Sequence, residues 1–483
     1  MKKVISIVFF TLLITTISFS QNGSDALRYS QSFPQGTARL SSMGGAFGAL
    51  GADFSAILIN PAGLGVYRKS EFVLTPSISY NKTLSNLNNH AYEDFKYDFG
   101  LNNIGLVGTF KTGNKNGWIS TSIAFGYNRI RNFDFNTLVK TDEATSSMLD
   151  EFVYNANNGD IRNFYEKMAI NTGAIYFDSL SNIYTNNFIK YNNSEYGHLQ
   201  RRSINTSGKM GEYVAAIATN FDNKVFIGAS IGFQKVNYSS TSIHEEEDTR
   251  DEIEYTNRFI YEDNLKTEGI GINFKLGAIV KPVQWIRIGG AIHSPTFFDL
   301  KEDFNSTMDF FMDNEIDQFR DIASGGYDYE LTTPLKAIGS LGFVIYKSAI
   351  VSFEYEFIDY STMRLRNGGD GYDFYNENEE IQGKYVSTGN LKSGAELKFG
   401  PLSLRAGYSL YGSPYNSDAL NKDAFTTAYS GGFGINSKSF YFDFAYVYSQ
   451  QSIEYVLYQY SDPVVSTIEK NPNQLMATLG FRF

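Results

Sequence analysis

The 483-residue chain contains no cysteine, only 10 prolines and only four histidines, which lie far apart along it. The absence of cysteine fits an exported protein that needs no disulfide. A catalytic triad needs a histidine beside a nucleophile and a carboxylate. His293 and Ser294 are neighbours in a strand-like segment, so their side chains point to opposite faces. No Walker, zinc, dinucleotide or G-x-S-x-G motif is present. We therefore expect no enzyme activity, no metal site and no cofactor.

The chain also lacks an excess of positive charge and, beyond its N-terminus, any long apolar run. Its formal net charge of −11 disfavours nucleic acid as a partner. Lys2-Lys3, the apolar run Val4–Phe19 and the small-x-small sequence Ser18-Phe19-Ser20 predict a secretory signal peptide over residues 1–20. No later stretch approaches the ~20 apolar residues that a transmembrane helix requires. The mature protein is therefore either soluble after export or a membrane β-barrel.

Aromatic residues, by contrast, are abundant, with 40 phenylalanines and 34 tyrosines. Many of them recur at every second position, which is the period of a β-strand. Five aromatic side chains share one face of Phe440–Tyr448, and an apolar face alternates with polar residues in Val351–Phe357. Leu402–Leu410 and Leu475–Phe483 alternate in the same way. Aromatic residues at the ends of strand after strand fit the two interfaces of a bilayer.

The spacing of these segments predicts an all-β fold, a transmembrane antiparallel β-barrel of about 14 strands. We expect strands near residues 71–81, 101–111, 117–130, 208–220, 224–239, 267–281, 285–298, 332–346, 349–363, 386–399, 402–411, 426–436, 439–454 and 473–483. Short connections alternate with long ones, and the long ones are 82–100, 131–207, 240–266, 299–331, 364–385, 412–425 and 455–472.

Short turns on one side, long loops on the other and an even strand number are typical of outer-membrane barrels. Residues 71–483 are therefore predicted to span the bacterial outer membrane in contact with its lipids. The chain ends on Phe483, which we expect to contact the barrel-assembly machinery.

The long connections are polar and acidic, as in His244–Asp248 and Asn376–Glu380. Neither run has the alternating ligand spacing of a calcium loop, so we interpret both as solvated loops. In loop 131–207, apolar residues recur at helical spacing within Met148–Tyr154 and Asp160–Ile170. They predict two short amphipathic helices outside the membrane. Their apolar faces either pack on the barrel rim or line an apolar entrance.

Between the signal peptide and the first strand lies Gly51–Gly65, GADFSAILINPAGLG. Phe54 and Ile57 recur at helical spacing and predict one short helix. Asn60-Pro61 signals a sharp turn, because proline fixes its own φ and pushes Asn60 out of the helical region. The stretch is too apolar for an ordinary surface loop. We expect residues 21–70 to form a hatch that plugs the barrel lumen.

Several charged residues alternate with the apolar positions of the predicted strands and should face the lumen. They are Arg287, His293, Glu354, Glu356 and Arg405, with Lys275, Glu396, Lys398 and Arg482 in equivalent positions. Two roles are open to them. Opposite charges can pair and fill the interior of the barrel, or individual residues can bind a substrate. For each residue taken alone, pairing is the simpler interpretation.

The chain contains, in this order, Asn60-Pro61-Ala62, Gly289–Thr296, Glu354–Ser361 and Arg405–Tyr408. These four segments resemble motifs of the FadL family of outer-membrane transporters, which carry long-chain fatty acids and other hydrophobic compounds. Asn60-Pro61-Ala62 is similar to the Asn-Pro-Ala hatch motif of the family. Gly289–Thr296 resembles its Gly-x-x-Tyr-Arg-Ser strand, with Ile292-His293 in place of Tyr-Arg. Glu354–Ser361 and Arg405–Tyr408 resemble two later strands. The resemblance runs through most of the mature chain.

This resemblance implies a barrel of fourteen strands, plugged by an N-terminal hatch, that takes up hydrophobic small molecules such as fatty acids or aromatic hydrocarbons. The ligand would leave sideways beside a kinked strand. Gly126 is the candidate for that kink, because glycine weakens strand pairing. Two alternatives remain. One is a general porin without a hatch, and the other is a non-transporting barrel or adhesin whose long loops bind a partner.

Overall fold

The computed structural model describes residues 23–33, 35–159, 161, 164–188, 197–313, 318–346, 348–459 and 463–483. The predicted signal peptide, residues 1–20, lies outside the described residues, and so does Asp160, the expected start of the second loop helix.

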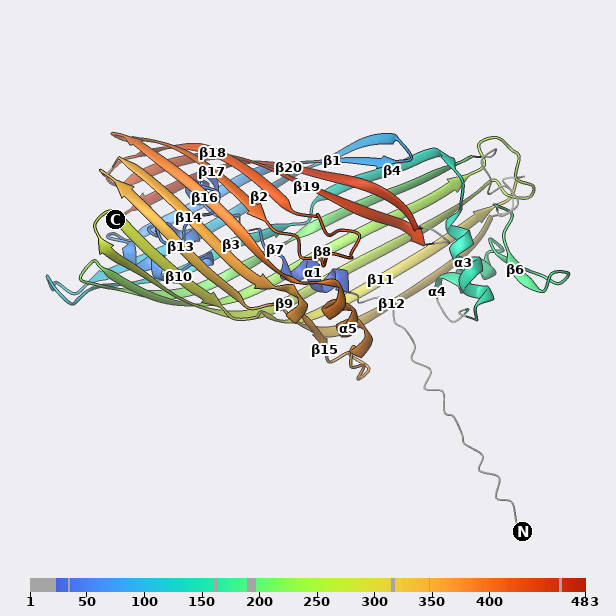
Figure 1. Cartoon of the computed structure of the whole chain (residues 1–483), viewed down its shortest axis with the longest axis horizontal. Coiled ribbons are helices and arrows are strands. Elements are labelled where there is room, and N and C mark those ends of the chain that lie inside the picture. The colour runs from blue at the N-terminus through green and yellow to red at the C-terminus, as the bar shows by residue number, and fades with distance from the viewer. Residues whose placement is uncertain are drawn as a thin grey trace, which may run out of the picture.

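Within the described residues, fourteen strands pair into a closed antiparallel ring (Figure 1). The ring closes because β1 pairs with β2 on one side and with the last strand, β20, on the other. The strands are β1 (Glu71–Leu87), β2 (His90–Lys111), β3 (Trp118–Asn132), β7 (His198–Phe221), β8 (Val225–Glu247), β9 (Arg258–Val283), β10 (Ile286–His293), β13 (Lys336–Ile345), β14 (Ala349–Asp359), β16 (Ser387–Phe399), β17 (Leu402–Tyr411), β18 (Thr426–Asn436), β19 (Phe440–Gln459) and β20 (Pro463–Arg482). The predicted fold class and strand number are confirmed.

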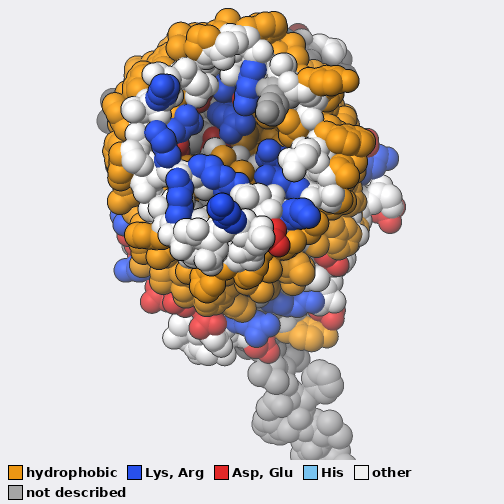
Figure 2. Space-filling view, turned by 90° about the vertical axis from the view of Figure 1, so that its left-hand side faces the viewer, with side chains coloured by type: hydrophobic (Ala, Val, Ile, Leu, Met, Phe, Trp, Pro, Cys, Tyr) orange, Lys and Arg blue, Asp and Glu red, His pale blue; other side chains and the backbone are white. Residues whose placement is uncertain are grey.

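The two faces of the ring differ as the alternation predicts. On β14, Phe353 is 50% exposed, whereas the neighbouring Glu354 is buried. On β17, Leu404 is exposed and Arg405 is buried. A closed ring leaves no unpaired sheet edge in the lipid, and an apolar outer surface meets the acyl chains. Figure 2 shows this apolar surface around the outside of the wall.

Four of the expected long loops are largely strand, and these predictions were wrong. In place of loop 82–100, β1 and β2 run on and meet at Asn88-Asn89, whose φ angles are +51° and +66°. Asparagine tolerates this left-handed region, which a two-residue hairpin turn requires. Loops 240–266 and 455–472 shrink because β8, β9, β19 and β20 also continue past the membrane. Loop 299–331 is a hairpin, described next. Polar residues form strands here because both faces of an extension outside the lipid can be solvated.

The remaining elements lie at the ends of the ring or inside it. β11 (Phe297–Phe311) and β12 (Gln318–Thr332) form the hairpin, and β11 pairs with residues Arg258–Ile272 of β9. The other short elements are β4 (Phe135–Ala144), β5 (Tyr176–Asp178), β6 (Ile183–Thr185), β15 (Arg364–Arg366), η4 (Tyr360–Thr362) and α5 (Tyr375–Lys384). The two predicted amphipathic helices are present as α3 (Met148–Asn157) and α4 (Phe164–Asn171), at the end opposite the C-terminus (Figure 1). No helix in the described part of the chain is long and apolar enough to cross a membrane.

The N-terminal segment lies inside the ring (Figure 1). It comprises α1 (Gly23–Ser30), α2 (Ala38–Ser42) and two 3₁₀ helices, η1 (Phe54–Leu58) and η2 (Pro61–Val66). We call residues 23–70 the hatch segment. α2 contacts β17 to β20, whereas η2 contacts β7 to β9, so the segment touches opposite walls. Phe54 and Leu64, which water would otherwise surround, are fully buried. The predicted short helix is present, and a second follows the Asn60-Pro61 turn.

Candidate functional site: the lumen and its hatch segment

Asn60 joins the hatch segment to the wall through its whole side chain. Its Oδ1 accepts a hydrogen bond from the Ala62 N–H at 3.0 Å, which caps η2, with Pro61 at the first helical position. Its Nδ2 donates to the backbone oxygens of Gly48, Ala278 and Gly290, at 2.7, 3.1 and 3.3 Å. The last two belong to β9 and β10. One buried amide therefore shapes the turn and fixes it against two strands.

Glycines in the wall make room for this close approach. A Cβ at Gly277 would lie 2.0 Å from Asn60 Oδ1, and one at Gly228 would lie 2.5 Å from the backbone of Pro61. Any side chain at these positions would push the turn inward. The same holds at five other wall glycines. Gly289 faces Gly48, Gly394 and Gly407 face Met43-Gly44, and Gly105 and Gly126 face Phe54. The wall is thus shaped to the hatch segment.

Gly126 belongs to this set of wall glycines. A Cβ there would lie 2.5 Å from the ring of Phe54. Strand pairing at Gly126 is regular, opposite Gly105 and Val214. The register of β3 shifts later, between Arg129 and Arg131. A second shift lies at the other end, between Trp118 and Ser120. The assignment of a kink to Gly126 stays a prediction, and both observed irregularities lie near the ends of the strand.

A buried ionic network connects α2 to β16, β17 and β19. Glu396 accepts hydrogen bonds from Arg39 Nε at 3.0 Å and from Arg405 Nε at 2.7 Å. Arg405 Nη1 also donates to Asp443 at 2.6 Å. Two carboxylates thus lie among the cations, which offsets the cost of burying these charges. This network is invisible to local sequence analysis, because its members come from four separate segments.

Of the other lumen-facing residues named from the sequence, Lys275 pairs with Glu212 and Arg482 with Glu71 on the wall. The next four contact the hatch segment or share a partner. Glu354 accepts from the Gly48 N–H at 2.9 Å, and Lys392 bridges it to Glu356, with Nζ at 3.1 and 3.8 Å from the two carboxylates. His293 Nε2 donates to the Ile59 oxygen at 2.8 Å, and Arg287 Nη1 donates to the Leu50 oxygen at 2.7 Å. The side chains of His293 and Arg287 are thus each hydrogen-bonded to the backbone of the hatch segment.

On the outer side of the hatch segment lies a cavity of about 190 Å³. Phe33, Leu40 and Ile59 of the hatch segment line one side of it, and Tyr411 and Gln474 lie on the wall. Its lining combines apolar side chains with amide and hydroxyl groups, such as those of Asn132, Ser409 and Gln474. The cavity can therefore hold a ligand that has both apolar and polar parts.

Two cations border this cavity without an acidic partner. Arg131 donates to the backbone oxygen of Arg28 at 2.7 Å, and Lys470 Nζ lies 5.4 Å from the ring centre of Phe135. Neither forms an ion pair with a carboxylate of the described residues. A third cation on the cavity wall, Lys392, is paired with Glu354 and Glu356. The cavity wall is therefore positively charged, in a chain whose net charge is −11.

The ladder between β2 and β3 ends beside this cavity. The two strands pair from Lys111↔Ser120 only as far as Asn103↔Asn128. Beyond that point β3 stays paired with β7, while β2 stays paired with β1. Side chains cross the interval instead, and Arg129 Nη1 donates to Asp98 at 2.7 Å. Asn132 Nδ2 also donates to Asp98, at 3.2 Å. The backbone wall is interrupted here, and side-chain contacts to Asp98 bridge the interval.

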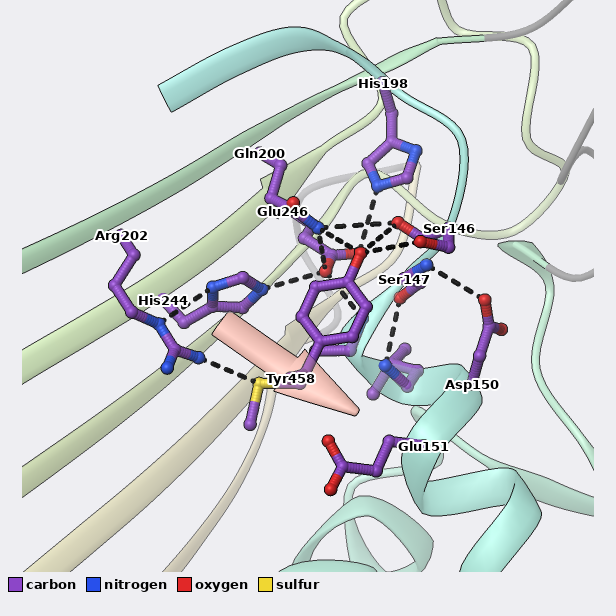
Figure 3. Close-up of polar contacts among 12 residues, drawn as sticks. Ser146, Ser147, Asp150, Glu151, His198, Gln200, Arg202, His244, Glu246 and Tyr458 are labelled. Carbon is purple, nitrogen blue, oxygen red and sulfur yellow. Dashed lines mark hydrogen bonds and ion pairs between the residues drawn. The ribbon is translucent and has the colours of Figure 1, made fainter. Parts of the chain in front are cut away.

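A second buried cluster lies at the outer end, beneath α3 (Figure 3). Glu246 accepts from Nε2 of His198 at 3.1 Å, from Nε2 of His244 at 2.8 Å and from the Met148 N–H at 2.8 Å. Arg202 Nε donates to Nδ1 of His244 at 3.2 Å. The interpretation of His244–Asp248 as a solvated loop was wrong, because His244 and Glu246 are fully buried. Their partners lie in distant segments, which the local sequence does not reveal.

The protonation of this cluster follows from its contacts. It lies outside the lipid-facing belt, whose last exposed large apolar residue on β8 is Phe233. Burial lowers the pKa of His244 to about 4, and the charge of Arg202 acts in the same direction. Burial alone would raise the pKa of Glu246, but hydrogen bonds from His198 and His244 hold it well below its usual range. A neutral His244 thus bridges the charges of Arg202 and Glu246.

We expect Glu246→Ala to release α3 from the strands beneath it. The change leaves buried donors of His198, His244 and Met148 without an acceptor, at a cost of about 3–5 kcal/mol. Cleavage of residues 148–175 by added protease in proteoliposomes should become much faster, while heat-modifiable migration on gels shows an intact barrel. Glu247→Ala, one position along, should not change the cleavage rate. Equal cleavage in both variants would contradict this role of Glu246.

Solved structures reveal the same architecture. The toluene transporter TodX of Pseudomonas putida superimposes with a TM-score of 0.56 and 11% identity, over 93% of this chain and 99% of that one. A Pseudomonas aeruginosa FadL homologue gives 0.53 and 10%, over 94% and 99%. The chain has the FadL-type fold. No family model matches the sequence, and no curated protein is significantly similar to it.

The FadL-type fold with its closed ring places the chain in the outer membrane, as the sequence predicts. The toluene transporter TbuX of Ralstonia pickettii has this fold as well, at a TM-score of 0.50 and 13% identity over 93% of this chain and 99% of that one. The short turns and the C-terminus therefore lie at the periplasmic end, and α3 and α4 lie outside the cell. At these identities the likeness concerns the fold, so the ligand has to be argued from this chain.

Proposed function

We propose that the protein is a passive outer-membrane transporter of hydrophobic small molecules that carry an acidic head group, such as long-chain fatty acids. The observation that carries the proposal is the cavity above the hatch segment, with the unpaired cations Arg131 and Lys470 on its wall. Both cations are partly buried. A partly buried cation without a counter-ion is costly, and a ligand carboxylate would compensate it.

The apolar part of such a ligand would gain from the aromatic and aliphatic residues around the cavity. Covering apolar surface contributes about 25 cal/mol per Å². A neutral aromatic hydrocarbon would gain only from this apolar contact, and it would leave Arg131 and Lys470 without a counter-ion. The named neighbours include toluene transporters, but the charge of this cavity favours an acid over a hydrocarbon.

We further propose that residues 21–70 act as the plug that prevents free diffusion of water and ions. Asn60, Pro61 and Ala62 would hold its shape, and the wall glycines would seat it. A ligand in the cavity would then leave sideways through the interruption between β2 and β3, once the Arg129–Asp98 pair opens. A general porin needs an open lumen, and the buried contacts of the hatch segment disfavour it.

Ligand binding to the detergent-purified protein tests this proposal. We expect Lys470→Met to weaken binding of oleate about tenfold or more, because a charge-assisted hydrogen bond is lost, and to leave binding of oleyl alcohol unchanged. Isothermal titration calorimetry measures both. Lys438→Met, at an exposed periplasmic turn, is the matched control. Equal affinity of the wild type for the acid and the alcohol would contradict an acidic cargo.

A further inference from the structure

The periplasmic end of the barrel is strongly basic, although the whole chain has a net charge of −11. Figure 2 looks onto this end and shows lysine and arginine side chains around a hollow, with few acidic ones. Three cations lie at this end where the hatch segment meets the wall. Arg68 follows η2, Lys281 lies near the end of β9, and Arg287 lies near the start of β10. We call them the mouth triad.

The three members lie within electrostatic range of one another. Arg287 lies opposite Lys281-Pro282 at a bulge in the ladder of β9 and β10. The Lys281 N–H donates to the backbone oxygen of Lys224 at 2.7 Å, and the neighbouring Asn223 is the partner of Arg68. None of them forms an ion pair with a carboxylate of the residues that the structure describes. Glu396, a buried carboxylate of the hatch network, is shared by Arg39, Arg405 and Lys398. The triad is thus a local excess of positive charge that no described side chain neutralises.

The contacts of Lys281 and Arg287 orient them toward the lumen, whereas Arg68 is exposed at its mouth. Lys281 Nζ lies 4.5 Å from the ring centre of Phe226, a residue buried against Ala62 of η2. Arg68 Nη2 donates to Asn223 Oδ1 at 2.8 Å. Arg287 Nη1 donates to the Leu50 oxygen, but its Nε is buried without a partner among the described atoms. Snorkelling toward lipid phosphates explains rim lysines, but it does not explain cations that contact the hatch segment.

We propose that the mouth triad is a binding site for an anionic head group, a carboxylate or a phosphate, on the periplasmic side of the hatch segment. Two guanidinium groups and an ammonium group provide the donors that such oxyanions prefer. Lys281 and Arg287 are half-buried, so an anion bound there is screened less by salt than one on the open rim. The ligand source is either a free organic acid or phosphate, or the head group of an anionic phospholipid.

The site stands apart from the cavity above the hatch segment. Neither Arg131 nor Lys470 belongs to the mouth triad, so the test of this site does not depend on oleate binding. The two sources of the anion are distinguished by two measurements on the full-length protein. In a non-ionic detergent, calorimetric titration with hexanoate and with inorganic phosphate probes free anions. Native mass spectrometry after reconstitution compares retention of phosphatidylglycerol with that of phosphatidylcholine.

We expect the wild type to bind at least one of these anionic probes, and Arg68→Gln with Lys281→Gln to weaken that binding about tenfold or more. The control removes the same number of charges from the rim, as Lys69→Gln with Lys438→Gln, and should change it less than twofold. Arg287→Lys, which keeps the charge, should retain most of the affinity. Binding of hexanoate or phosphate identifies a free anion, and selective retention of phosphatidylglycerol alone identifies the lipid. If the wild type binds none of the probes, or if the rim variant loses as much affinity as the triad variant, the proposal is wrong.

Discussion

Deletion of residues 24–66 should turn a protein that conducts almost no ions into an open pore. The intact lumen is crossed by η1, η2 and α2, which bury Phe54, Leu64 and Met43 against opposite walls. A ring of about this strand number is wide enough for an aqueous channel when nothing fills it. We expect the conductance of single molecules in planar bilayers to rise about tenfold or more and to stay steady. The wall should persist, because β1 to β20 remain bonded to their neighbours.

A point variant separates loss of the plug from loss of folding. Asn60→Ala removes one cap and two contacts to the wall but leaves the rest of the hatch segment in place. It should produce brief, flickering openings, while heat-modifiable migration stays that of the wild type. If the full-length protein already conducts like an open porin and the deletion changes nothing, the plugging role of residues 21–70 is contradicted.

Phe353→Arg should block assembly of the barrel into membranes. Phe353 lies on the outer face of β14 and is half exposed to lipid. An arginine near the middle of the lipid face costs roughly 2–4 kcal/mol. We expect the yield of folded protein in large phospholipid vesicles to fall several-fold, measured as the fraction with heat-modifiable migration.

The neighbouring residue provides the control for this prediction. Glu354 points inward, where it accepts from the Gly48 N–H and pairs with Lys392. Glu354→Gln keeps the shape and one acceptor, so folding should change much less. Equal folding yields of the two variants would mean that the inner and outer faces of β14 are reversed.

The wall of this protein was predictable from sequence because its signal is local. Alternation of Phe353 with Glu354, and of Leu404 with Arg405, fixes the facing of a strand without knowledge of its neighbours. Short turns between such strands also fix which end is which. Strand length was not predictable in the same way, since polar segments such as 90–100 become strand only when a hairpin partner bonds to them.

The site depends on contacts between distant segments, and less of it could be predicted. Asn60 was identified as the end of a turn, but its bonds to β9 and β10 depend on where the barrel places Ala278 and Gly290. Gly126 was noticed for the weakness of glycine in strands, whereas in the structure it faces Phe54. Glu246 was read within an acidic run, and its burial depends on His198 and Met148. No local pattern indicates that Arg131 and Lys470 border one cavity.

Uptake of an acidic amphiphile across an outer membrane tests the central claim most directly. The measurement is the initial rate of radiolabelled oleate uptake, at submicromolar concentration, by Gram-negative cells that lack their own fatty-acid transporter and express this protein. We predict a rate several-fold above that of cells with an empty vector, and a rate near the vector background for Lys470→Met at equal surface expression. A wild-type rate equal to that of the empty vector would contradict the account.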